Sequence, residues 1–155
     1  MMTRPHARFM RAILTALATT AAASAFAATL NGQAQGGGVP IANSTVTLWS
    51  ASAGSPKQLA QAKTEADGRF ALNAPDVVDK GGTLYLVAKG GISAANKAGG
   101  DNPAIVLMTA LGSKPPATVT INEMTTVASV WTHNQFIDGT VIQGQPLQLR
   151  IAAGN

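Results

Sequence analysis

The sequence predicts a mainly β protein: a seven-stranded antiparallel sandwich with one α-helix in its C-terminal half. Short segments rich in β-branched residues recur along the chain and alternate apolar with polar side chains, as half-buried strands do. Glycine, proline, asparagine and aspartate separate these segments and mark turns. Cysteine is absent, which excludes disulfides, a thiol nucleophile and thiolate metal sites, so the fold must rest on packing alone.

The N-terminal segment, residues 1–27, has the pattern of a secretory signal peptide. MMTRPHARFMR contains three arginines and no acid, and the apolar run AILTALATTAAASAFA follows it. Ala25-Phe26-Ala27 fits the small-x-small rule of signal peptidase, and about 16 apolar or small residues are short for a membrane span. We therefore expect cleavage after Ala27, Sec export to the periplasm or the medium, and no membrane span in the mature chain. A retained anchor helix is the alternative, which the weak hydrophobicity of alanine disfavours.

Removal of the leader changes the charge balance. The whole sequence has 11 basic and 7 acidic residues, and three arginines leave with the leader, so the mature chain is nearly neutral. The remaining cations are scattered singly, with no basic stripe and no interleaved aromatic platform, and this excludes a nucleic-acid-binding protein. Residues 28–155 have the size of one domain that can bury its own core.

Seven segments carry the strand pattern, and turn signals separate them. They are residues 28–35, 44–51, 58–65, 69–73, 83–89, 105–111 and 117–121. Seven short strands at this spacing predict two packed sheets. The glycine-rich segment 90–103 and the proline turn 112–116 connect neighbouring strands. Near the C-terminus, PLQLRIA at 146–152 alternates leucine and isoleucine with polar residues, which favours one more strand.

A helix is predicted where this alternation stops, over approximately 122–137. In NEMTTVASVWTHNQF the apolar residues recur at helical spacing, at Met124, Val127, Ala128 and Trp131. Asn122 can cap the helix, Glu123 is favourable in its first turn, and Asp138-Gly139 offers a left-handed stop. We expect the apolar stripe to pack on the sandwich, where burial of Trp131 contributes about 3 kcal/mol. The alternative is an exposed docking face for a partner.

The stretch TEADGRFAL, residues 64–72, gathers two carboxylates, a glycine and an arginine in one polar patch. Asp67-Gly68 between strand-like residues predicts a structural turn of the tight hairpin type, in which glycine supplies the positive φ. A calcium loop is the functional alternative. It needs more oxygen ligands at regular spacing than Glu65 and Asp67 supply, so the turn is favoured.

VPIANSTVTLW followed by TEADGRFAL resembles the pattern of carboxypeptidase regulatory-like domains, P-x-x-x-a-x-V-x-L and then T-x-x-D-G-x-F-x-L. The matching residues are Pro40, Val46, Leu48, Thr64, Asp67, Gly68, Phe70 and Leu72. This resemblance covers roughly residues 30–89. It implies a small transthyretin-like or Ig-like sandwich that accompanies enzymes and surface proteins without catalysing a reaction itself. Similar proteins are usually longer, so the chain could be the N-terminal part of a longer member.

Catalytic groups form no recognisable constellation. His133 is the single histidine after the leader, no G-x-S-x-G elbow accompanies it, and no acid lies three or four residues away. We expect a solvated helix histidine. Asp76 and Asp79 come closest to a pair of acids, and beside Lys80 they fit a solvated turn. We therefore predict a protein that is not an enzyme and has no cofactor and no metal.

Trp49 and Tyr85 are the candidate ligand-stacking residues. Alternation along the predicted strands puts Trp49 with the threonines, on the more polar face, and Tyr85 opposite its leucine neighbours. The two rings could stack on sugars, or they could form the surface on which the helix packs. The first function class is accordingly a structural or protein-interaction module with an envelope protein as partner. The alternative is a carbohydrate-binding accessory module with a glycan as partner.

The leader prediction is tested by intact-mass spectrometry of the exported protein. We expect a mature chain that begins at Ala28, because signal peptidase cuts after a small-x-small triplet. Retention of residues 1–27 on the secreted form would contradict the leader and the charge balance that depends on its removal.

Overall fold

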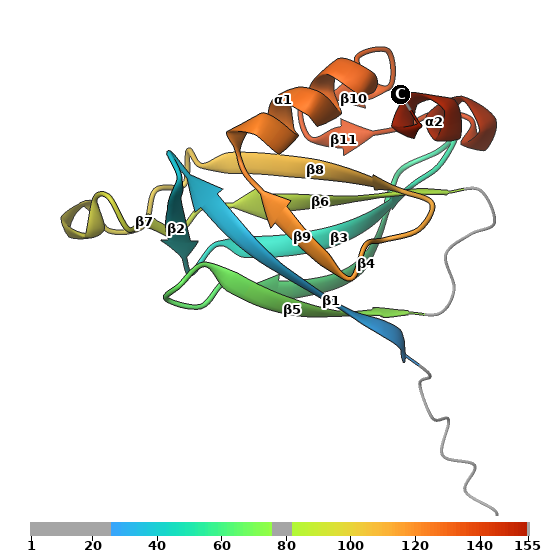
Figure 1. Cartoon of the computed structure of the whole chain (residues 1–155). Helices are drawn as coiled ribbons and strands as arrows, with labels where there is room; N and C mark the ends of the chain where they lie inside the picture. The colour runs from blue at the N-terminus through green and yellow to red at the C-terminus, as the bar shows by residue number, and fades with distance from the viewer. Residues whose placement is uncertain (1–25, 76–81, 155) are drawn as a thin grey trace, which may run out of the picture.

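The computed structural model describes residues 26–75 and 82–154, in which two β-sheets face each other across an apolar core (Figure 1). One sheet has the order β5-β1-β2-β7, with β9 added beside β1, and the other has the order β4-β3-β6-β8. The strands are β1 Phe26–Gly36, β2 Val39–Ala42, β3 Thr45–Ala51, β4 Lys57–Lys63, β5 Arg69–Pro75, β6 Thr83–Lys89, β7 Ile92–Ser93, β8 Val106–Gly112, β9 Thr118–Ile121, β10 Ile137–Asp138 and β11 Val141–Ile142. The helices are η1 Lys97–Gly99, α1 Glu123–Thr132 and α2 Pro146–Ala153.

The mainly β class and its antiparallel pairing are confirmed. Each of the seven strands expected between residues 28 and 121 overlaps an observed one, and β6 matches in both bounds. The pair β1 and β9 is parallel, while the other strand pairs in the described residues are antiparallel. Sequence reasoning missed β2, β7, β10 and β11, which have two to four residues each. Strands this short do not show a measurable alternation.

The core forms because alternate residues of both sheets point inward. Leu30 and Leu72 from one sheet face Leu48 and Leu86 from the other, and none of these four side chains is more than 2% exposed. Within the described residues, no helix is long and apolar enough to cross a membrane. Strand β1 begins at Phe26, two residues before the expected mature terminus, and residues 1–25 lie outside the described part of the chain.

The Asp67-Gly68 turn is present, but it does not close a hairpin. Strand β4 pairs with β3 in one sheet and β5 pairs with β1 in the other, so this turn carries the chain between the sheets. Gly68 has a φ of 77°, its N–H donates to the Glu65 carbonyl at 2.9 Å, and the Asp67 carboxylate accepts the Arg69 N–H at 3.0 Å. A Cβ on Gly68 would lie 2.6 Å from the carbonyl oxygen of Ala34. Glycine is therefore required here by both conformation and space.

Thr64 fastens the start of this turn to the neighbouring loop. Its buried hydroxyl accepts the Ser44 N–H at 2.8 Å and donates to the Ile41 carbonyl at 2.7 Å. Asn43, which has a φ of 58°, donates its N–H to the Thr64 carbonyl at 3.0 Å. These bonds satisfy backbone groups that the connection between β2 and β3 would otherwise leave buried without partners.

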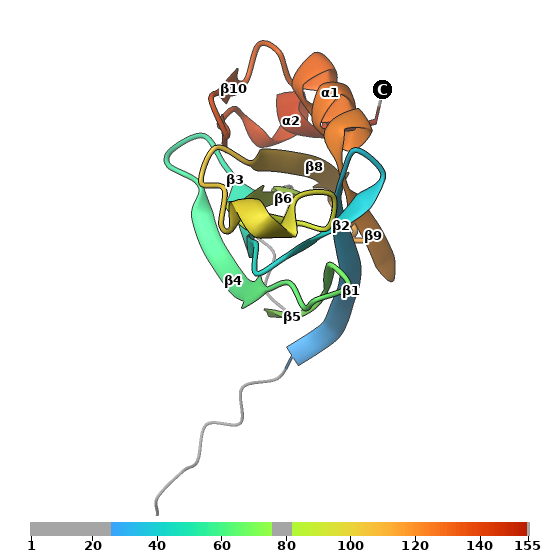
Figure 2. The ribbon, with the colours of Figure 1, turned by 90° about the vertical axis from the view of Figure 1, so that its left-hand side faces the viewer.

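Helix α1 lies against β8 with the opposite face from the one expected (Figure 2). The Thr126 hydroxyl accepts the Met108 N–H at 2.9 Å, and the Ser129 hydroxyl accepts the Ala110 N–H at 2.8 Å. The expected stripe points into solvent instead, with exposed fractions of 76% for Met124, 65% for Val127 and 80% for Trp131, and Ala128 is exposed as well. The expectation that this stripe packs on the sandwich was therefore wrong.

The beginning of α1 was predicted correctly and its end was not. The Asn122 side chain accepts the Thr125 N–H at 2.9 Å and the Thr125 hydroxyl accepts the Asn122 N–H at 3.0 Å, which forms a capping box. The helix ends at Thr132, and the positive φ of 57° at Gly139 belongs to the turn between β10 and β11. The residues from His133 onward, which were expected to continue the helix to about residue 137, instead lead into this hairpin.

The expected C-terminal strand at 146–152 is helix α2. Pro146 stands in the first turn, where its fixed φ suits a helix and its missing N–H costs nothing. Of the three alternating apolar residues only Leu149 is buried, while Leu147 and Ile151 are 61% and 60% exposed. Burial of Leu149 and Ala152, three residues apart, follows the helical period.

We predict that the hydroxyls of α1 stabilise the fold more than its tryptophan does. Ser129→Ala or Thr126→Val leaves a β8 N–H without its partner, and we expect a loss of about 1–3 kcal/mol in the free energy of unfolding. Trp131→Ala removes an exposed side chain and should change the free energy of unfolding by less than about 0.5 kcal/mol. Chemical denaturation of dilute protein measures both effects. A larger loss from Trp131→Ala than from Ser129→Ala would contradict this orientation of the helix.

Candidate functional site

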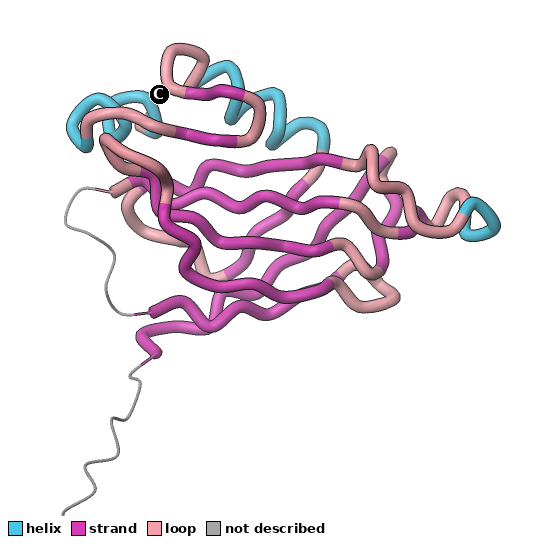
Figure 3. The backbone as a smooth tube through the Cα atoms, turned by 180° about the vertical axis from the view of Figure 1, so that it is seen from behind, coloured by secondary structure: helices cyan, strands magenta, loops and turns pink. Residues whose placement is uncertain are grey.

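A groove of about 370 Å³ lies on the outer face of the β4-β3-β6-β8 sheet, on the side away from the core. Figure 3 shows the backbone of the strands from behind. Alternate residues of β3 and β6 form its floor. Residues of β4 and Pro56 form one rim, and Thr140 and Val141 at the turn of the β10–β11 hairpin form the other. The volume lies within the range of about 300–1,000 Å³ that small-ligand sites occupy.

The two rings predicted from sequence meet in this groove. Trp49 and Tyr85 are partners in the register of β3 and β6, so their side chains share one face of the sheet. Trp49 is half-buried, whereas Tyr85 is only 1% exposed. The structure therefore leaves part of the Trp49 ring open to a ligand, while the Tyr85 ring is buried in the floor of the groove.

The C-terminal segment, and not the stripe of α1, covers the Tyr85 ring. Tyr85 packs with Ile142 and Leu149 in a second apolar cluster, and its hydroxyl accepts the Ile142 N–H at 3.4 Å. Burial raises the pKa of Tyr85, and the bond from Ile142 opposes this rise only in part. The expectation that Trp131 could pack on these rings was wrong, because Trp131 points into solvent on the other side of α1.

Polar side chains continue the groove away from the rings. Thr47 lies next to Gln61 in the register, and the Gln61 amide donates to the Thr47 hydroxyl at 3.1 Å. One step further, Thr45 is flanked by Lys63 on β4 and Lys89 on β6, and both lysines are exposed. Sequence reasoning did not group these residues, because only the strand register brings them onto one face.

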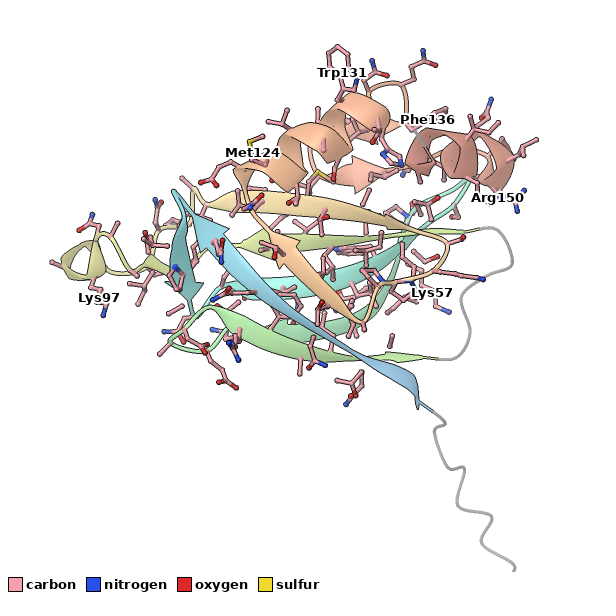
Figure 4. All side chains as sticks on the ribbon, viewed as in Figure 1. Lys57, Lys97, Met124, Trp131, Phe136 and Arg150 are labelled. Carbon is pink, nitrogen blue, oxygen red and sulfur yellow. The ribbon has the colours of Figure 1, made fainter. Side chains whose placement is uncertain are left out.

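A second surface, which we call the helical face, is apolar and exposed. It consists of Met124, Val127, Val130 and Trp131 of α1 with Leu147 and Ile151 of α2, all between 41% and 80% exposed. Met124 and Trp131 project outward from α1, and Arg150 lies at the far end beside α2 (Figure 4). Glu123 begins α1 at the opposite end, where it accepts the Gly37 N–H at 2.7 Å.

His133 is buried, which contradicts the expectation of a solvated helix histidine. Its exposed fraction is 0%, its Nδ1 lies 2.9 Å from the Thr132 hydroxyl and 3.2 Å from the Ser129 carbonyl, and its Nε2 has no partner among the described residues. His133 caps the C-terminal end of α1 and is buried on the same inward, polar side of the helix as Ser129. Burial lowers the pKa of His133, and the bond to the Ser129 carbonyl opposes this shift in part.

The described residues bring no acids to His133. In residues 26–75 and 82–154, no three histidine or carboxylate side chains cluster in a way that could hold a metal ion. Asp76 and Asp79, the nearest approach to a pair of acids in the sequence, lie outside the described residues. Glu65 and Asp67 belong to the turn between the sheets, and Asp67 pairs with Arg69 at 3.4 Å.

Comparison with known proteins adds little to this geometry. No family model and no curated protein matches the chain. Among solved structures, a 9R-lipoxygenase from Cyanothece PCC8801 is similar over 61% of this chain, with 17% identity and a TM-score of 0.35. This chain spans 16% of the length of that lipoxygenase. A similarity at this level carries no argument about the fold or the activity.

We predict that His133 makes stability depend on pH. Because the pKa of His133 is lower in the folded state than in the unfolded one, the unfolded state binds the proton more readily. The contribution of His133 to the free energy of unfolding is at its full value above the ordinary histidine pKa of about 6.5, and it falls as the pH drops below that value. Denaturation midpoints compared at about pH 7.5 and about pH 5.5 measure the effect. His133→Gln should flatten this dependence, and an unchanged slope would contradict the assignment.

Proposed function

We propose that this protein is a non-catalytic, exported β-sandwich module for protein interaction, and that the helical face is its docking surface. The observation that carries the proposal is the exposure of Trp131 and Met124 on a helix whose other side is bonded to β8. Large apolar side chains gathered on the exposed side of one helix are a mark of interaction sites. A docking role is thus better supported than a purely structural one.

The occupant that we assign to this surface is a second copy of the chain. Glu123 begins α1 and places a carboxylate at one end of the helical face. Arg150 of α2 places a guanidinium at the other end (Figure 4). A two-fold axis through its middle brings the Glu123 end of one copy to the Arg150 end of the other, so opposite charges meet. A lipid surface is less well supported, because Arg150 is the only cation in residues 122–154 and membrane-binding helices carry several.

The resemblance to carboxypeptidase regulatory-like domains supports a module without chemistry of its own. The residues that carry it have structural roles: Thr64 bonds the β2–β3 connection, Gly68 permits the turn between sheets, and the Phe70 ring covers Gly32. A transthyretin-like or Ig-like arrangement, a periplasmic or extracellular location and a place at the N-terminal side of a longer protein all belong to this proposal.

Carbohydrate binding is the second candidate function, and the groove favours it. Trp49 is half-buried on the groove floor, and amides and hydroxyls lie beside it on the same face. An aromatic ring beside neutral polar groups suits a sugar, which has apolar ring faces and a hydroxyl rim. The groove lies on the sheet and the helical face lies on the helices, so the two functions do not compete for one surface.

We predict a reversible dimer whose population rises with protein concentration. Sedimentation equilibrium or light scattering measures it. Met124→Gln with Trp131→Gln should weaken association by at least about tenfold, or about 1.4 kcal/mol, because both side chains leave water only in the dimer. The stability of the monomer should hardly change.

The matched control is Ala71→Gln on β5, an exposed position on the other sheet, which should leave association unchanged. A wild-type protein that stays monomeric at every accessible concentration would overturn the second copy as occupant. An equally strong dimer in the double variant would show that another surface is used.

A further inference from the structure

We propose that the groove binds an acidic saccharide, with a sugar ring on Trp49 and a carboxylate or sulfate group between Lys63 and Lys89. This inference rests on the second candidate function, carbohydrate binding, and names the chemical class of its ligand. Its basis is the order of side chains along the groove, which runs from an aromatic ring through neutral polar groups to Lys89. Lys63 does not line the groove itself, but the strand register places it beside Thr45 at the same end.

The cationic end is defined by the register of three strands. Lys63 and Lys89 are the neighbours of Thr45 on either side, so all three side chains leave the same face of the sheet. The two lysine backbones are two strand spacings apart, about 10 Å, and their flexible side chains can reach one anionic group from both sides. Neither lysine has an ion-pair partner within the described residues, where Arg69 and Asp67 form a salt bridge.

The length of the groove favours an oligosaccharide over a small free anion. Trp49 and Thr45 are four residues apart on β3, which is about 13 Å along an extended strand. A free phosphate at the lysines would leave the aromatic end unused. A saccharide uses the whole groove, because its ring faces stack on Trp49 while its hydroxyls bond to Thr47, Gln58 and Gln61.

The test uses Trp49 as its own reporter. The chain has two tryptophans, so Trp131→Phe leaves Trp49 as the single emitter. This protein is titrated with a galacturonic acid tetramer, with the same tetramer fully methyl-esterified, and with a sulfated galactose tetramer. The methyl ester keeps the rings and removes the charge, and the sulfated tetramer distinguishes a sulfate ligand from a carboxylate.

We expect Trp49 fluorescence to change on titration with an acidic tetramer. The affinity should be at least about tenfold lower for the methyl ester, and the double variant Lys63→Gln with Lys89→Gln should lose a similar factor for the acidic tetramer. Lys114→Gln, an exposed lysine on the β8–β9 connection that does not line the groove, is the matched control and should bind as the parent does. These lysines are exposed, so the variants should fold normally, and thermal unfolding checks this.

The outcomes separate this inference from the function on which it rests. Equal binding of the acid and its methyl ester, lost in Trp49→Ala, would overturn the acidic class and keep carbohydrate binding. Binding of inorganic sulfate as tightly as either acidic tetramer would overturn the saccharide. No response to any of these probes would overturn both the inference and the second candidate function.

Discussion

The free edge of β8 is the constraint on which the C-terminal third of this protein depends. Among the residues that the structure describes, β8 is last in its sheet and pairs with β6 alone. Its other edge therefore presents N–H and C=O groups that must be covered or left to pair with another strand. Helix α1 covers them with hydroxyls from Thr126 and Ser129. Met108 and Ala110, two alternate residues of β8, bond to two hydroxyls that lie three residues apart, on one side of the helix.

Three features of the structure follow from the bonding of the α1 hydroxyls to the edge of β8. The polar side of α1 faces inward, so His133 is buried with it and its pKa is lowered. The apolar side of α1 faces outward, which produces the helical face. The β10–β11 hairpin and α2, and not α1, cover the apolar end of the outer sheet surface, where Ile142 and Leu149 pack on Tyr85. One strand edge thereby determines a titrating group, an exposed patch and the rim of the groove.

The features that could be predicted from sequence are those encoded locally. Period-two alternation located the strands, Asp67-Gly68 located a turn, and Asn122 located the start of α1, because each depends on residues within a few positions. The hairpin interpretation failed because the sheet that a strand joins is a non-local property. Trp49 was correctly placed on the outer face by alternation, but the lysines beside Thr45 become neighbours only through the register.

The orientation of α1 could not be read from hydrophobicity, because threonine and serine count as polar although their hydroxyls can bond a strand edge. A signal was nevertheless present: Thr125, Ser129 and His133 recur every four residues on a side of the helix that has no full charge. A solvent-facing side of a surface helix normally carries charged residues. Their absence indicates a polar face that is meant for burial.

The two surfaces have a joint consequence if each acts as proposed. The groove lies on the β4-β3-β6-β8 sheet and the helical face lies on the helices, so a dimer formed through the helices would leave both grooves open. A polymer long enough to reach both grooves would make its second contact at a high effective concentration. Weak single-groove binding would then be sufficient for retention on a repetitive acidic polysaccharide. Dimerisation through the exposed helices would thus join two weakly binding grooves into one bivalent binding protein.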